Sequence, residues 1–255
     1  MESSKTTQIK IAFFSALPPF RGGISSFSRF LVNALKGKSL IEAFTFKKQY
    51  PNFLFPGKSQ FSKGKEASFP RIITSYNPFT YFKAGRKLKQ AKPDVFVVNY
   101  WMPFFAPMYA FLASRFSNSV LKVALIHNLT PHEERFFDRF LNRMFLKNFD
   151  AFVVLSEKVN QDLLSYRPNA ISKVIPHPAY NQFGSKKDFQ HAREYFNIDK
   201  DAKVLLFFGL IRDYKGLDIL IEAMNFLDER YVLLIAGEIY GDKKKYLKAI
   251  EAIKK

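Results

Sequence analysis

The chain has 255 residues, of which 47% are hydrophobic, and carries a formal net charge of +18 without a single cysteine. This length and hydrophobicity suffice for one large or two modest cores, while the lack of cysteine excludes disulfides, thiolate nucleophiles and cysteine-ligated zinc. No uncharged apolar run of about 18 residues and no signal peptide occurs, so we expect a cytoplasmic protein that can still lie against a membrane.

Hydrophobic runs alternate with helical patterns along the whole chain. The expected strands are 9–15, 94–98, 121–126, 150–155, 172–175, 203–209 and 231–236. The expected helices are 24–36, 78–91, 103–116, 134–148, 157–166, 188–197, 216–228 and 242–254. Continuous apolar strands that alternate with helices predict an α/β fold with parallel strands and with ligands at their carboxyl ends.

The first polar loop, in "SALPPFRGGISSFSRFLVNAL" (residues 15–35), contains Gly22 and Gly23 between a strand and a helix. Glycines at this turn let phosphate or sugar oxygens approach the amides of the helix N-terminus. The pattern is not G-x-G-x-x-G, which makes a nicotinamide enzyme a weak alternative. The glycines could also serve only to turn the chain.

Residues 47–92 combine positive charge with aromatic rings. They hold 11 lysines and arginines against the single acid Glu66, and the first 150 residues as a whole hold 23 basic residues against 8 acids. Such a mixture suits an anionic membrane surface or single-stranded nucleic acid, and it is also compatible with a generally lysine- and phenylalanine-rich composition.

A second polar cluster lies in "LIHNLTPHEERFF" (residues 125–137). His127 ends a predicted strand, and Asn128, His132 and Glu133 follow it, a place suited to substrate hydroxyl contacts and acid–base chemistry. A zincin motif is excluded because Phe136 stands where the second histidine would be needed. His127 could equally be a structural histidine.

The third cluster is the turn in "FFGLIRDYKGLDILIEAM" (residues 207–224). Gly209 ends a strand, Arg212 and Lys215 project from the turn, and Gly216 begins a helix. A guanidinium and an ammonium beside a helix N-terminus favour a diphosphate, although both cations could simply be solvated.

Together these stretches resemble glycosyltransferase family 4, in the same order along the chain. "PPFRGGISSFSRFL" resembles the family's glycine loop and "IHNLTPHE" its histidine-containing strand end. "VLSEKVNQDLL" and "VIPHPAY" resemble its interdomain approach, and "FGLIRDYKG" its donor-binding turn.

The resemblance implies a GT-B architecture, with an N-terminal acceptor-side Rossmann-like domain (1–182) and part of a C-terminal donor-binding domain (183–255). It implies a retaining transferase that uses a nucleotide-diphosphate sugar and no metal ion or other cofactor. Arg212 and Lys215 would neutralise the leaving diphosphate, and His127 would contact the transferring sugar. Gly22, Gly23, Asn128, His132, Glu133, Gly209 and Gly216 would bind donor or acceptor.

The paired-glutamate motif of the family is expected beyond residue 255, so we expect an incomplete chain that is inactive as this fragment. The expected acceptor is a glycan or a lipid-linked molecule, as in cell-envelope polysaccharide synthesis, at the inner face of an anionic membrane. The rival hypothesis is a non-catalytic basic and aromatic module that binds membrane or nucleic acid. Nucleic acid is not expected as a partner, because no recognised nucleic-acid motif is present.

Overall fold

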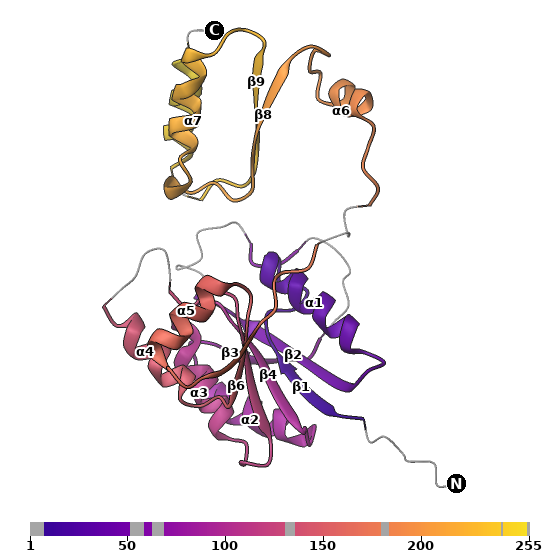
Figure 1. The fold of residues 1–255 in the computed structure, drawn as a ribbon, viewed down its shortest axis with the longest axis vertical. Coiled ribbons are helices and arrows are strands. Elements are labelled where there is room, and N and C mark those ends of the chain that lie inside the picture. Colours follow the sequence, from indigo (N-terminus) through magenta and orange to yellow (C-terminus); the bar gives the residue numbers. More distant parts are fainter. Residues whose placement is uncertain are drawn as a thin grey trace. The chain divides into compact units, whose positions relative to one another are not determined.

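The computed structural model describes residues 8–51, 59–62, 69–130, 136–179, 184–240 and 242–253. The chain divides into two compact units, and the boundary lies between Pro178 and Ala179. Each unit is an α/β structure (Figure 1).

The first unit is built on a seven-stranded, entirely parallel sheet. Its strands lie in the order β3-β2-β1-β4-β5-β6-β7. Their bounds are β1 Lys10–Phe14, β2 Leu40–Lys48, β3 Arg71–Thr74, β4 Val95–Tyr100, β5 Leu121–Ile126, β6 Ala151–Val154 and β7 Ile171–Val174. The order reverses direction at β1 and β4, which is where ligands bind in doubly wound sheets.

Helices cover both faces of this sheet. They are α1 Gly23–Leu35, α2 Phe79–Gln90, α3 Ala106–Ser114 with the short η2 Pro103–Phe105 before it, α4 Asp138–Leu146 and α5 Glu157–Tyr166. Figure 1 shows α1 on one side of the sheet and α3, α4 and α5 on the other. The main core lies on the second side, where residues of α2 to α5 pack against the strands.

The second unit is smaller. It contains α6 Phe189–Tyr195, the parallel strands β8 Lys203–Phe208 and β9 Tyr231–Ala236, α7 Leu217–Ala223 and α8 Lys243–Glu251, with short η3 Asp213–Lys215 and η4 Met224–Phe226 around α7. Ile211, Leu217, Ile221 and Tyr246 form its core. On β8, Val204, Leu206 and Phe208 are exposed among the described residues.

The predicted α/β fold and all seven predicted strands are confirmed, but the prediction omitted β2 and β3. In β2, Glu42, Thr45 and two lysines interrupt the apolar run, although Phe44 and Phe46 are fully buried. β3 has only four residues and begins with Arg71 at the edge of the sheet. Short or mixed strands near a sheet edge lack the continuous apolar pattern that marks the central strands.

Candidate functional site

The carboxyl ends of β1, β4 and β5 lie next to one another in the first unit. The loop after β1 contains Gly22 and Gly23, and His127 follows β5 directly. The His127 amide donates a hydrogen bond of 2.8 Å to the Tyr100 carbonyl at the end of β4. The sheet order therefore gathers two of the three predicted clusters at one edge.

Gly22 and Gly23 form an open N-terminus for α1. Gly22 has φ +113°, which favours glycine, and no side chain caps the 13-residue helix. A Cβ atom built on either glycine meets nothing within 4 Å. The first turn also lacks an acid, so no carboxylate of the helix itself offsets the positive end of the helix dipole.

A buried polar cluster holds α1 against the sheet behind these glycines. The Ser28 hydroxyl lies 2.8 Å from the Ser15 hydroxyl and donates a 2.7 Å bond to the Ile24 carbonyl. It also accepts a 2.8 Å bond from the Asn99 amide. Ser15, Ser28 and Asn99 are fully buried, so these bonds fix the position of the first turns of α1 relative to β1 and β4.

His127 lies in an apolar setting at the same edge. Its ring meets the Phe27 ring of α1 edge to face, with centroids 4.8 Å apart. Its Nε2 atom is buried and has no hydrogen-bond partner among the described residues. Burial, and to a lesser degree the nearby His177, lower the pKa of His127 to about 3. The imidazole is therefore neutral at pH 7.

His177 is a member of this cluster that the sequence did not single out. Its ring centroid lies 5.6 Å from that of His127 and 5.2 Å from that of Phe27. It belongs to "VIPHPAY", which the sequence suggested only as part of the interdomain approach. A histidine between two prolines just after a strand was the available signal.

Of the other residues predicted for this cluster, the structure describes Asn128 but not His132 or Glu133. Asn128 is half-buried and follows His127 directly. His132 and Glu133 lie outside the described residues, so their predicted contact with a substrate stays a prediction.

The second unit carries the predicted cationic turn at the carboxyl end of β8. Gly209 has φ +113° and Gly216 is left-handed, with φ +69°, so both adopt conformations that favour glycine. Between them, Ile211 pairs with Ile239 in a parallel bridge, which joins this turn to the loop after β9.

Arg212 and Lys215 are both exposed on this turn. The Arg212 guanidinium lies over the Tyr240 ring, 5.4 Å from its centroid. The Lys215 Nζ lies 3.6 Å from the position of a Cβ built on Gly209, so this side chain folds back over the end of β8. Within the described ranges, neither cation forms an ion pair with a carboxylate.

The one acid of the turn is engaged elsewhere. Asp213 accepts a 2.9 Å hydrogen bond from the Tyr246 hydroxyl and pairs with Lys245 at 3.3 Å. Lys245 also pairs with Asp218 at 2.7 Å. The Asp213 carboxylate is thus paired with side chains of α8 and not with Arg212 or Lys215.

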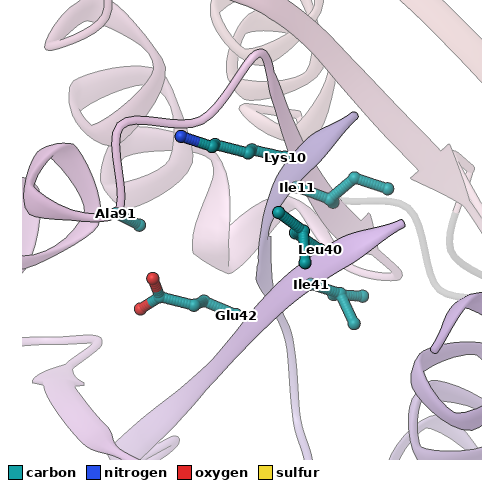
Figure 2. Close-up of a pocket in the computed structure, with 6 residues that line it drawn as sticks. All are labelled: Lys10, Ile11, Leu40, Ile41, Glu42 and Ala91. Carbon is teal, nitrogen blue, oxygen red and sulfur yellow. The ribbon is translucent and has the colours of Figure 1, made fainter. Parts of the chain in front are cut away.

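A cavity of about 360 Å³ lies at the amino ends of β1 and β2, opposite to the carboxyl ends. It is lined by Lys10, Ile11, Leu40, Ile41, Glu42 and Ala91. Lys10 and Leu40 are the first residues of β1 and β2. Figure 2 shows Lys10 and Glu42 extending to the same side as Ala91. Because ligands of such sheets bind at the carboxyl ends, this cavity is not the candidate site.

Comparison with protein families gives a match over residues 60–179, to the model of Glycosyltransferase Family 4. Over these residues the chain is similar to glycosyltransferase family 4. The family 4 segment includes β3 to β7 and both His127 and His177. None of the curated proteins matches the sequence significantly.

Solved structures show the same fold. HepE of Anabaena, solved with UDP and glucose, superposes with a TM-score of 0.67 at 14% identity, over 95% of this chain. The chain spans 65% of the length of that protein. An α-glucosyltransferase bound to UDP and DNA superposes with a TM-score of 0.51 at 15% identity, over 96% of this chain and 58% of that protein.

The UDP-GlcNAc 2-epimerase of Methanocaldococcus jannaschii gives a TM-score of 0.55 at 12% identity, over 96% of this chain and 68% of its own. The fold class is thus confirmed as GT-B type, with Rossmann-like units. At these identities the likeness concerns the fold, which transferases and epimerases share.

No helix in the described part of the chain is both long and apolar enough to cross a membrane.

Proposed function

We propose that this protein is a retaining glycosyltransferase that moves a sugar from a nucleotide-diphosphate sugar to a glycan or lipid-linked acceptor. The observation that carries the proposal is the turn after β8, where two exposed cations share a glycine-bounded loop and the neighbouring acid is paired with α8. The family 4 match of residues 60–179 supports the same reaction class.

The donor would bind through its diphosphate. The planar guanidinium of Arg212 suits two phosphate oxygens at once, and the Lys215 ammonium supplies a compact charge beside it. As the glycosidic bond to the diphosphate breaks, negative charge grows on the leaving oxygen. Fixed cations stabilise this charge more than they stabilise the bound substrate, which lowers the barrier. We propose that this neutralisation needs no metal ion.

The first unit would supply the acceptor side. Amides at the start of α1, at Gly22 and Gly23, can donate hydrogen bonds to sugar or phosphate oxygens. The neutral His127 ring can exchange a hydrogen bond with a sugar hydroxyl without placing a second positive charge next to an oxocarbenium-like sugar. Asn128, together with His132 and Glu133, is proposed to contact the donor or acceptor.

Two other functions are compatible with some of these features, an epimerase activity and a non-catalytic binding role. The epimerase fold is similar, but the family match is to glycosyltransferases. A non-catalytic basic module would account for the positive charge but not for the pairing of Asp213 with Lys245 of α8 beside the two exposed cations of the turn. Nucleic acid is not part of the proposal, although one structurally similar transferase was solved with DNA.

Calorimetric titration of the full chain with UDP and UDP-glucose tests the donor site. We expect binding that weakens about tenfold or more in Arg212→Ala and in Lys215→Ala, because hydrogen bonds to charged groups contribute about 1.5–3 kcal/mol. Arg230→Ala is the matched control, since Arg230 is an exposed arginine of the same unit that pairs with Asp228. Equal affinity in all three variants, or no binding of any nucleoside diphosphate to the wild-type chain, would reject the assignment.

A further inference from the structure

The outer surface of α2, α3 and α4 carries exposed phenylalanines. We call it the aromatic–basic face, and its rings are Phe79, Phe82, Phe104, Phe136, Phe137 and Phe140. Phe136 is 94% exposed, Phe79 86% and Phe140 67%. Single apolar side chains are common on protein surfaces, but six exposed phenylalanines, three on α2 and α4 and three just before α3 and α4, call for an explanation.

The three helices form one continuous layer. Tyr81 of α2, Met108 of α3 and Phe145 of α4 belong to the same buried core, so the opposite side of each helix faces outward. At the outer surface, the Phe82 ring of α2 contacts the Phe111 ring of α3, with centroids 5.0 Å apart. Helix α3 also packs against α4.

Every exposed charge on these three helices is positive. Helix α2 contributes Lys83, Arg86, Lys87 and Lys89, and α4 contributes Arg139 and Arg143. The single acid within the three helices is Asp138, which is 5% exposed. Within these three described helices, rings are therefore combined with cations and no carboxylate is exposed.

The rings gather at one end of the layer. Phe79 is the first residue of α2, Phe104 lies in η2 just before α3, and Phe136 and Phe137 precede α4. In a parallel sheet the helices begin at the carboxyl ends of the strands, which is the edge that holds His127 and the glycine loop. Four of the six rings thus lie at the same end of the sheet as His127 and the glycine loop.

We propose that the aromatic–basic face docks this protein on an anionic lipid bilayer. The rings would enter the interfacial region of the bilayer and the cations would lie against lipid phosphates. A bilayer accepts rings from separate helices, whereas single-stranded nucleic acid stacks successive bases on rings along one track. Docking would turn the acceptor edge of the sheet toward the membrane surface. This docking does not depend on sugar transfer.

The sequence located only part of this face. Segment 47–92 includes α2 but ends before the rings at the start of α4, at 136–140. Their position beside α3 depends on the packing of α4, which the local sequence does not reveal.

Co-sedimentation with vesicles tests the proposal on the full chain. We expect binding to vesicles of 70% phosphatidylcholine and 30% phosphatidylglycerol, and little binding to phosphatidylcholine alone. Phe79→Ser with Phe82→Ser should weaken binding about tenfold or more, and Phe226→Ser, an 87% exposed ring of the second unit, should not. Since these side chains are exposed, circular dichroism should show all variants folded.

Charge-reversal substitutions test the contribution of the cations separately from that of the rings. Lys83→Glu with Arg86→Glu should lower the vesicle partition coefficient about fivefold or more for each substitution, whereas Lys36→Glu with Lys38→Glu, just after α1, should have the smaller effect of net charge alone. Vesicle binding that depends neither on lipid charge nor on the Phe79 and Phe82 substitutions would overturn the proposal. So would a single-stranded oligonucleotide that displaces the protein from vesicles. UDP binding should be the same in all these variants, so failure of the docking proposal is distinguishable from failure of the donor-site proposal.

Discussion

The Gly237 backbone lies directly against the carbonyl group of Gly209: a Cβ on Gly237 would be 1.8 Å from the Gly209 oxygen. This contact joins the loop after β9 to the start of the cationic turn. Real Cβ atoms do not approach a backbone oxygen so closely, so a side chain at 237 must displace the turn. The position of Arg212 and Lys215 therefore depends on a glycine outside the turn itself.

Gly237→Ala should destabilise the second unit by about 2–4 kcal/mol, since the clash is with backbone that has no rotamer to relax into. Urea unfolding should show the loss, and UDP titration should show weakened binding. Gly23→Ala is the control for the unfolding measurement alone, because a Cβ there meets nothing within 4 Å. A Gly237→Ala protein as stable as wild type would contradict this packing.

Substitutions of Gly216 test the requirement for a left-handed backbone conformation rather than the steric room for a side chain. Its φ of +69° is left-handed, but a Cβ there would make only an ordinary 3.6 Å contact with Ile219. We expect Gly216→Asn to cost little, because asparagine tolerates this region, and Gly216→Val to cost about 1–3 kcal/mol. Thermal unfolding of the two variants measures the difference; similar losses in both would show that backbone conformation is not the constraint.

His127 should make stability depend on pH. Its folded pKa of about 3 lies below the unfolded value of about 6.5, so the unfolded chain binds the extra proton between these values. The contribution of neutral His127 to the free energy of unfolding is fully present above about pH 6.5. It is lost as the pH falls, and the free energy then decreases by at most about 1.4 kcal/mol per pH unit. Urea unfolding at pH 7, 6 and 5 should give a smaller slope for His127→Gln than for wild type. An unchanged slope would mean that His127 is solvated.

Ser28→Ala removes the hydroxyl at the centre of the buried polar cluster. It leaves the Ser15 hydroxyl and the Asn99 amide without this partner, so we expect a loss of about 1–3 kcal/mol in unfolding free energy. A double-mutant cycle with Ser15→Ala should show non-additive losses, because the two hydroxyls share one bond. Simple additivity would show that the pair is not coupled. Ser114→Ala, at an exposed serine of α3, is the control.

Local patterns predicted the strands with continuous apolar runs and missed β2 and β3. The apolar runs of β4, β5 and β9 and the helical stripe of α1 are readable in the sequence because burial on both faces of a strand, or on one face of a helix, leaves a periodic trace. β2 and β3 leave weaker traces, because Glu42 and Thr45 interrupt the apolar residues of β2 and β3 has only Ile72 and Ile73 as apolar residues.

The candidate site shows the same division. Gly22, Gly23, Gly209 and Gly216 were predicted from turn chemistry, and three of them have a positive φ. The contacts of Phe27 with His127 and His177 were not predicted, because they join residues separated by 100 and 150 positions in the chain.

The sequence by itself determined the alternation of strands and helices, the glycine turns and the cations of the turn after β8, since each rests on neighbouring residues. Only the tertiary structure decided the strand order that places His127 beside α1, and the burial that keeps its ring neutral. It also decided that Asp213 pairs with Lys245 and not with Arg212 or Lys215. Burial and electrostatic partners come from contacts between distant segments, which no local pattern encodes.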